Sequence, residues 1–392
     1  MFPGLKFWYV AVICLSLVGV ALFIKSRQPA PTFLSPLGEF SNFYRPKFKA
    51  EPAMETIGFL PYWNLDKTQV GPANVGQLIY FGLIAEKNGQ IKRIDGWEME
   101  PGWANFNTPK WQEYFVQAKS KKKKVLLTVL NFDDEEMNKL LASDEDKTNL
   151  IREIIEVIGE NNLDGVNIDF EYFSAENREF GANFNDFLEK LKAELTGTGK
   201  QMILSVDIYP KAVIQDKPYR LKELAGIADQ VILMAYDFTQ SNTERTGPVA
   251  PLRPSDEGKY SINQALQASF GKIDRQKLIL GIPLYGYEWP TVNAQPRSFV
   301  QWGISGVTAS YERVKKLIEE HKLPVNWDDL AYSPWLNYND EGVNKQIYFE
   351  NIKSITAKVD LARQLDLGGV AFWALGYEGN DPELWAEIRK KL

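Results

Sequence analysis

The residues with the clearest chemical potential lie in the run Asp-Gly-Val-Asn-Ile-Asp-Phe-Glu at positions 164–171. Its polar side chains, Asn167, Asp169 and Glu171, alternate with apolar ones. Because a β-strand turns successive side chains to opposite faces, these three should project from one face. Burying two carboxylates and an amide together costs free energy unless a function uses them. The pattern therefore predicts a strand that presents acid groups, rather than an exposed edge strand with scattered charge.

The elements that would position this strand recur along the chain as short apolar or β-branched runs, separated by stretches with helical periodicity. The predicted strands are Thr56–Trp63, Gln77–Ala85, Lys124–Phe132, Gly165–Tyr172, Met202–Tyr209, Gln230–Asp237, Leu278–Tyr285 and Gly369–Leu375. Predicted helices include Pro109–Lys121, Asp144–Asn161, Asn177–Thr196 and Tyr348–Leu365. Eight strands alternating with helices predict an α/β fold, a (β/α)8 TIM barrel. A doubly wound open sheet would be expected to carry an early phosphate-binding glycine loop, and the sequence has none.

The last two predicted strands are separated by a much longer stretch than the other pairs. We therefore expect a small α+β insertion between strands 7 and 8, at about residues 290–346, with a helix near Ser310–Glu320. Apart from this insertion, residues 55–392 would form the barrel.

In such a barrel the carboxyl ends of the strands form the active site. The residues at these ends are Tyr62, Trp63, Asn131, Asp169, Glu171, Asp207, Tyr209, Tyr236, Asp237, Tyr285, Tyr287 and Trp373. They predict a mouth rich in carboxylates and aromatic rings, without a cation. Aromatic faces stack on the apolar faces of sugar rings, and carboxylates bind hydroxyls and supply acid groups. This mouth therefore favours a carbohydrate ligand.

Four segments resemble motifs of glycoside hydrolase family 18. DGVNIDFE at 164–171 is similar to the family's fourth-strand signature, usually written DGxDxDxE. MAYD at 234–237 resembles the sixth-strand motif, and GIPLYG at 281–286 the seventh. GGVAFWALG at 368–376 resembles the eighth, which carries a tryptophan. The resemblance covers about residues 55–392 and implies the same barrel fold.

The resemblance implies a glycosidase that cleaves β-linked N-acetylhexosamine glycans, of the peptidoglycan or chitin type, without a cofactor or metal. In this family the substrate's own N-acetyl group acts as the nucleophile. Glu171 would be the acid and base, Asp169 would orient the acetamido group, and Tyr236 would donate to its carbonyl. Together with the strand-end positions, it gives an expected set of substrate-binding residues: Asn167, Asp237, Trp373, Tyr62, Trp63, Asn131, Asp207 and Tyr285.

Two segments depart from the family pattern. Asn167 stands where the signature has an aspartate, so the usual pair of carboxylates that shares one proton is absent. We expect the Asn167 amide to donate to Asp169 and keep it ionised. The third strand reads LLTVLNF at 126–132, where chitinases typically carry Ser-x-Gly-Gly. Both departures are similar to the branch that contains bacterial spore and cell-wall glucosaminidases.

Other function classes give different expectations. The chief alternative is a catalytically silent, lectin-like barrel, since a blocked groove would leave Glu171 and Asp169 in place. A structural envelope protein would have no need of the strand-end aromatic rings. The single histidine, His321, lies in a charged run, which excludes a Ser-His-Asp triad and disfavours a histidine-ligated zinc site. The net charge of -6 gives no reason to expect nucleic-acid binding.

The amino-terminal part of the chain has a different composition. Residues 1–27 predict a membrane anchor, because the apolar stretch 7–24 is long enough to span a bilayer. A cleaved leader is the alternative, but no Ala-x-Ala site closely follows the stretch. The proline-rich residues 28–54 predict an extended linker. We expect a monomer whose barrel lies outside the cytoplasm, or is secreted if the leader is cleaved.

Overall fold

The computed structural model of this protein describes residues 54–67, 71–174, 179–254 and 260–392. The predicted anchor lies outside the described residues, as does the predicted linker apart from its last residue. Within the described ranges, no helix is both long enough and apolar enough to cross a bilayer.

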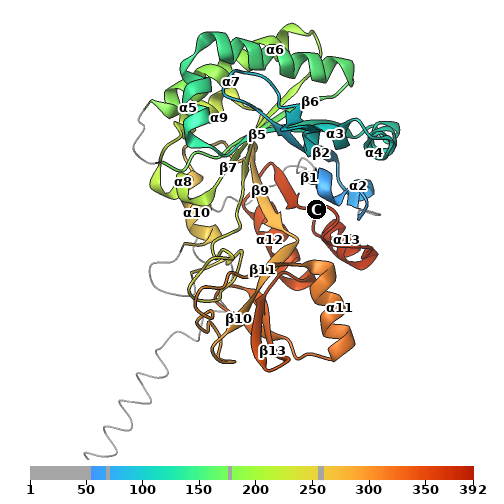
Figure 1. Cartoon of the computed structure of the whole chain (residues 1–392), viewed down its shortest axis with the longest axis vertical. Coiled ribbons are helices and arrows are strands. Elements are labelled where there is room, and N and C mark those ends of the chain that lie inside the picture. Colours follow the sequence, from blue (N-terminus) through green and yellow to red (C-terminus); the bar gives the residue numbers. More distant parts are fainter. Residues whose placement is uncertain (1–53, 68–70, 175–178, 255–259) are drawn as a thin grey trace, which may run out of the picture. The chain divides into compact units, whose positions relative to one another are not determined.

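Eight parallel strands close into a barrel in the order β1-β15-β9-β8-β7-β6-β5-β2 (Figure 1). They are β1 (Glu55–Pro61), β2 (Gln77–Ile84), β5 (Lys124–Asn131), β6 (Gly165–Phe170), β7 (Ile203–Ile208), β8 (Gln230–Leu233), β9 (Leu278–Pro283) and β15 (Gly369–Trp373). The first strand pairs with both β2 and β15, so the sheet is closed rather than open. All eight predicted strands are confirmed, and the doubly wound alternative is excluded.

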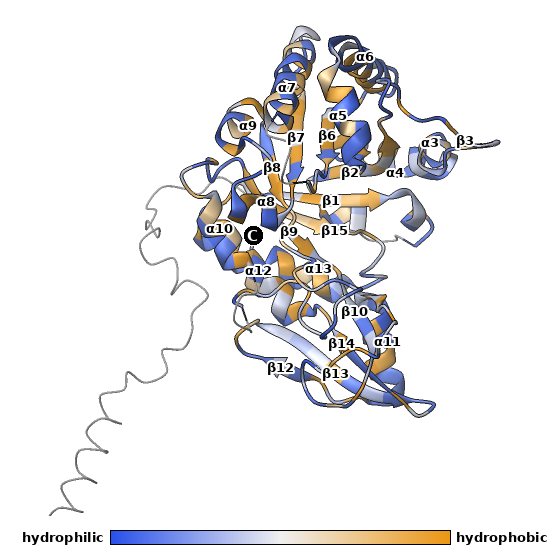
Figure 2. Cartoon of the chain, turned by 60° about the vertical axis from the view of Figure 1, so that its left-hand side comes forward, coloured by the Kyte–Doolittle hydropathy of each residue, from blue (hydrophilic) through white to orange (hydrophobic). Residues whose placement is uncertain are grey.

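Helices surround the barrel. They include α3 (Pro101–Phe106), α4 (Pro109–Ser120), α5 (Asp134–Ala142), α6 (Asp144–Glu160), α7 (Phe180–Gly197), α8 (Pro210–Gln215), α9 (Leu221–Ile227), α10 (Ile262–Ser269), α12 (Ile352–Gln364) and α13 (Pro382–Arg389). Figure 2 shows hydrophobic residues along β1, β7 and β15, and a mixture of hydrophilic and hydrophobic residues along the surrounding helices. The four helices named from the sequence are present. The last begins later than predicted, because Tyr348 ends a strand and the Asn351 side chain caps α12.

The interior of the barrel contains both an apolar cluster and a polar row. The apolar cluster consists of Ile57, Phe59, Ile79, Phe81, Leu126, Leu130, Ile232, Ile279 and Ala371. In the polar row, Thr128 of β5, Asn167 of β6 and Ser205 of β7 lie opposite one another in register. Acid groups at the barrel mouth can therefore form hydrogen bonds with these buried polar residues.

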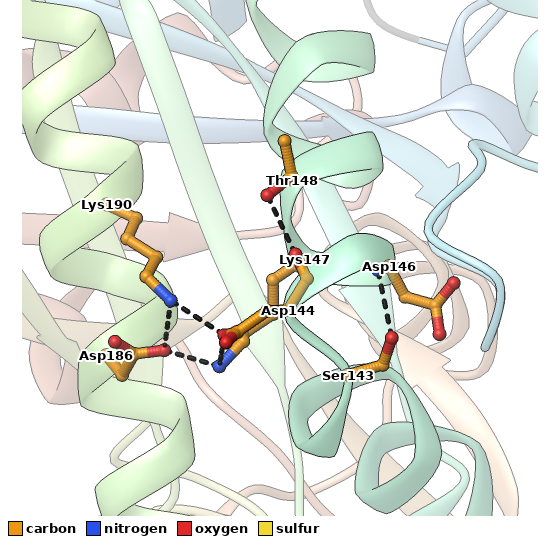
Figure 3. Close-up of polar contacts among 7 residues, drawn as sticks. All are labelled: Ser143, Asp144, Asp146, Lys147, Thr148, Asp186 and Lys190. Atoms are coloured by element: carbon orange, nitrogen blue, oxygen red, sulfur yellow. Dashed lines mark hydrogen bonds and ion pairs between the residues drawn. The ribbon is translucent and has the colours of Figure 1, made fainter.

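Ion pairs join the two helices that precede and follow β6. The Lys147 side chain of α6, which is 6% exposed, contacts Asp144 at 2.9 Å and also contacts Asp186 of α7. Lys190 of α7 bridges the same two carboxylates at 2.8 and 2.9 Å (Figure 3). This network holds α6 against α7 and so supports the strand that carries the predicted acid groups.

A five-stranded antiparallel sheet lies between β9 and β15 in the chain, where the insertion was expected. Its strand order is β11-β10-β14-β13-β12. The elements are β10 (Tyr285–Thr291), β11 (Val307–Ser310), α11 (Tyr311–His321), β12 (Asn326–Asp328), β13 (Ser333–Asp340) and β14 (Val343–Tyr348). The sheet begins before the predicted residue 290, because Tyr285 starts β10 instead of ending a barrel strand. It ends after the predicted residue 346, because β14 continues to Tyr348.

Candidate active site

The end of β6 presents its side chains as the alternation predicted. The apolar set faces outward, where Phe170 stacks on Phe184 and Phe187 of α7 at centroid distances of 5.8 and 5.9 Å. Asp169 lies among the buried residues of the barrel interior. The Glu171 backbone N–H donates to the Asn131 carbonyl at 3.1 Å, which extends the strand pairing past the end of β6. The strand therefore carries its acid groups up to the barrel mouth.

Glu171 lies on the wall of a cavity of about 600 Å³. Tyr236 and Asp237 line the same cavity. Burial, followed by the nearby charge of Asp237, raises the pKa of Glu171 to about 7. A carboxyl with this pKa keeps its proton close to neutral pH, which a general acid requires.

Two tyrosines hold Asp237 in place. The Tyr285 hydroxyl donates to Asp237 Oδ1 at 2.5 Å and the Tyr287 hydroxyl at 3.0 Å. Burial raises the pKa of Asp237, and these two hydrogen bonds oppose the rise. Tyr285 is buried and its hydroxyl bonds to Asp237, so it positions that carboxylate. Its contact with a ligand stays a prediction. Both tyrosines belong to β10, so the inserted sheet contributes to the site.

Tyr236 and Asp237 lie beyond β8, which ends at Leu233 and not at Asp237 as predicted. The pKa of Tyr236 is raised well above its usual value, first by burial and then by the charge of Asp207 and of the other nearby carboxyls. Its hydroxyl therefore stays protonated and can donate a hydrogen bond. Gly281 of β9 leaves space for this ring, because a Cβ there would lie 3.1 Å from Tyr236 Cε1.

Asn167 does not bond as the sequence predicted. Its Nδ2 donates to Asp207 Oδ1 at 2.8 Å and to Ser205 Oγ at 3.2 Å, while its Oδ1 accepts from the Thr128 hydroxyl at 2.8 Å. Both amide hydrogens are thus used toward β7, and the predicted bond to Asp169 is wrong. Asn167 is 0% exposed, and its predicted contact with a ligand stays a prediction.

Asn131 and Asp207 are buried too. The Asn131 amide donates to the Ala85 carbonyl at 2.7 Å, and its oxygen accepts from the Asp133 N–H at 2.8 Å. Its side chain therefore links the backbone at Ala85 to that at Asp133. Its contact with a ligand stays a prediction. Asp207 accepts a hydrogen bond from Asn167, and its contact with a ligand stays a prediction.

The opposite side of the mouth is aromatic. Trp373 packs on Phe81, Phe59 and Trp63 at centroid distances of 4.6, 5.8 and 6.3 Å. Trp63 remains 42% exposed, and Tyr62 packs edge-on against it at 4.9 Å. The sequence placed Tyr62, Trp63 and Trp373 at the mouth, and the structure brings them together there. Phe81 was missed, although it follows Ile79 by two residues and so lies on the same inward face of β2.

Several residues that line the cavity were not assigned to the site from the sequence. Phe173 and Lys211 line the cavity, as does Tyr209, whose ring stacks on Phe173 at 5.3 Å. Tyr209 was predicted at a strand end but not as a site residue. Lys211 makes the prediction of a mouth without a cation wrong. Phe173 and Lys211 follow the strand ends by a few residues, where no periodicity indicates which way a side chain points.

Comparison with known proteins gives the family. The chain is 25% identical over 254 residues to a putative sporulation-specific glycosylase of Bacillus subtilis, covering 64% of this chain and 56% of that protein. It is 24% identical over 272 residues to the cortical fragment-lytic enzyme of the same organism, covering 67% and 58% respectively. The chain thus spans just over half the length of these two relatives.

Solved structures share the fold. The Bacillus cereus spore cortex-lytic enzyme SleL matches with a TM-score of 0.70 and 21% identity, over 89% of this chain and 76% of that one. A group IV chitinase of Ostrinia furnacalis matches with a TM-score of 0.75 and 20% identity, over 87% and 100%. The sequence profile of the glycosyl hydrolases family 18 matches residues 55–378. The chain belongs to glycosyl hydrolase family 18.

Proposed function

We propose that this protein is a glycosidase that cleaves β-linked N-acetylhexosamine glycans, with Glu171 as its acid and base. The observation that carries the proposal is the position of Glu171. It lies on the wall of an open cavity, its pKa is raised to about 7, and Asp169 and Tyr236 are its neighbours. A carboxyl of this acidity can both give and accept a proton near neutral pH.

The reaction would be substrate-assisted. Glu171 protonates the glycosidic oxygen while the substrate's acetamido oxygen attacks the anomeric carbon. Asp169 Oδ1, which has no hydrogen-bond partner among the described residues, accepts the acetamido N–H and stabilises the positive oxazolinium ring. The Tyr236 hydroxyl holds the acetamido carbonyl in position. In the second step Glu171 takes a proton from water, and the water oxygen attacks the anomeric carbon. The oxazolinium ring then opens, and the configuration is retained overall.

We propose peptidoglycan as the substrate class, with chitin-type chains as the alternative. The Bacillus relatives named for spore-cortex lysis support the first, and the relatives named as chitinases support the second. The exposed ring of Trp63 and the stacked pair Phe173–Tyr209 offer faces for sugar rings on either polymer.

The experiment compares the purified full chain with its Glu171→Gln variant on purified peptidoglycan and on chitin oligosaccharides. We expect new reducing ends, identified by mass spectrometry, and a loss of kcat of about 10²–10⁴-fold in the variant. Glu113→Gln on exposed α4 is the matched control and should keep full activity. If neither substrate is cleaved while both proteins still bind it, the chain is the lectin-like barrel instead.

We also propose that residues 7–24 anchor the protein in a membrane and hold a monomeric barrel outside the cytoplasm. The apolar stretch and the proline-rich residues after it support this arrangement. Fractionation of cells that express the full chain tests it. Recovery of the uncleaved chain in the soluble fraction would contradict it.

A further inference from the structure

Two buried carboxyls lie side by side where β6 meets β7. The strands pair in parallel, with Asn167 opposite Ser205 and Ile168 opposite Val206. Asp169 and Asp207 directly follow the last of these pairs, one on each strand, and the charge of Asp207 acts on Asp169. By the alternation of a strand they face the barrel interior, as Asn167 and Ser205 do. Their exposed fractions are 2% and 3%, so both carboxyls are almost completely removed from water.

Asn167 is oriented by its neighbours to support one of these carboxyls. The Thr128 hydroxyl donates to the amide oxygen, which turns Nδ2 toward β7. Nδ2 then donates to Asp207 Oδ1 at 2.8 Å. An aspartate at position 167 would offer no hydrogen here and would add a third acid to the cluster. The amide on β6 and the carboxyl on β7 are therefore complementary.

We infer that Asp207 is the carboxyl partner of Asp169, and that the two hold one proton between them across the β6–β7 junction. The family signature places such a partner at position 167, on the same strand as Asp169. In this chain position 167 is an amide, and the carboxyl that we assign as the partner lies on the neighbouring strand. The inference rests on the proposed glycosidase function and assigns Asp207 a positioning role within it.

The surroundings of the pair favour a shared proton. Burial raises the pKa of both carboxyls, and Glu171 raises both further. Asp207 adds to the rise at Asp169, while the Asn167 amide lowers the pKa of Asp207. From beyond β8, Tyr236 faces the cluster with a neutral hydroxyl. Two adjacent buried acids in such a site titrate as a pair, with the first proton bound far more tightly than the second.

The shared proton would give Asp169 two useful states. With the proton on Asp207, Asp169 is ionised and its unpartnered Oδ1 can accept the substrate's acetamido N–H. With the proton on Asp169, the negative charge rests on Asp207 against the Asn167 amide. The proton moves between two carboxylate oxygens, so the charge of the pair stays at minus one throughout.

A double-mutant cycle on the full chain tests the inference through the variants Asn167→Asp, Asp207→Asn and the combination of both. We expect each single variant to lower kcat by about tenfold or more. In Asp207→Asn the acid limb of the pH–kcat profile should move to lower pH, because Asp169 loses a like-charged neighbour. The combination returns both carboxyls to β6 and should recover most of the activity and the original limb. Strong non-additivity of this kind indicates direct coupling.

Thermal unfolding of the same four proteins between pH 4 and pH 8 gives a readout that does not need activity. The folded-state pKa values of the pair are raised, so the wild-type Tm should fall as pH rises through them. The fall should be smaller in Asp207→Asn, whereas Asp340→Asn on the exposed inserted sheet should leave it unchanged. If no wild-type hydrolysis is seen, the proposed function fails, while the Tm profile still tests the pair. An unchanged Tm slope in Asp207→Asn, or a combined variant no better than the single ones, would overturn the inference.

Discussion

At the scale of single residues, the acid strength of Glu171 is set by two features of its surroundings. Burial removes water from the carboxylate, and the Asp237 charge opposes a second negative charge nearby. Tyr285 and Tyr287 hold that neighbouring carboxylate in place. The protonation of Glu171 at neutral pH therefore depends in part on Asp237, which takes no direct part in the proposed proton transfer.

Replacing Asp237 with asparagine should make Glu171 a stronger acid. The substitution removes a like charge, so the pKa of Glu171 should fall from about 7. Glu171 must be protonated to donate, so activity should then be lost at a lower pH. We expect the alkaline limb of the pH–kcat profile to move down by about one pH unit. Asp340→Asn is the control, and an unmoved limb in Asp237→Asn would show that Asp237 does not tune the acid.

At the scale of elements, β8 and β9 approach closely enough to require a glycine. A Cβ on Gly281 would lie 2.7 Å from the Leu233 carbonyl oxygen, 3.1 Å from Met234 Cα and 3.1 Å from Tyr236 Cε1. Two of these three atoms belong to backbone, which cannot turn aside as the end of a side chain can. The Tyr236 ring can therefore lie where it does only because Gly281 on β9 has no side chain.

Gly281→Ala should therefore displace Tyr236 and reduce activity. We expect kcat to fall by about tenfold or more, since a misplaced positioning group is costly to catalysis. The loss of stability should be smaller, about 1–3 kcal/mol, as is usual for overpacking. Steady-state kinetics and urea unfolding measure the two effects. Gly159→Ala on α6 has no atom within 4 Å of the new Cβ and should retain full activity.

The sequence predicts strands well here, because buried parallel strands form short apolar runs between helices. It predicts partners less well. Asn167 was located from its place in the signature motif, but its hydrogen-bond partners depend on the register of β7, which the β6 sequence does not contain. Asn131 occupies a strand end as expected but bonds to backbone there. Residues past the strand ends, such as Lys211, follow no period and were missed for that reason.

At the scale of the whole molecule, the barrel and the inserted sheet form one site and must keep their relative placement. The chain leaves the inserted sheet after β14 and returns to the barrel through α12. At this junction Glu350 and Lys358 form an ion pair of 2.7 Å in which both side chains are 0% exposed. A buried pair contributes little net stability, but removing one partner leaves an uncompensated charge in the interior.

Lys358→Met should destabilise the protein by about 3–5 kcal/mol, measured by urea unfolding at pH 8. The loss should be smaller at pH 5. Without the lysine the folded-state pKa of Glu350 rises further, so stability is present at low pH and lost as pH rises through that pKa. The combination Glu350→Leu and Lys358→Met removes both charges and should recover most of the stability at either pH. Equal losses in the single and combined variants would show that packing at Lys358, and not its charge, holds this junction together.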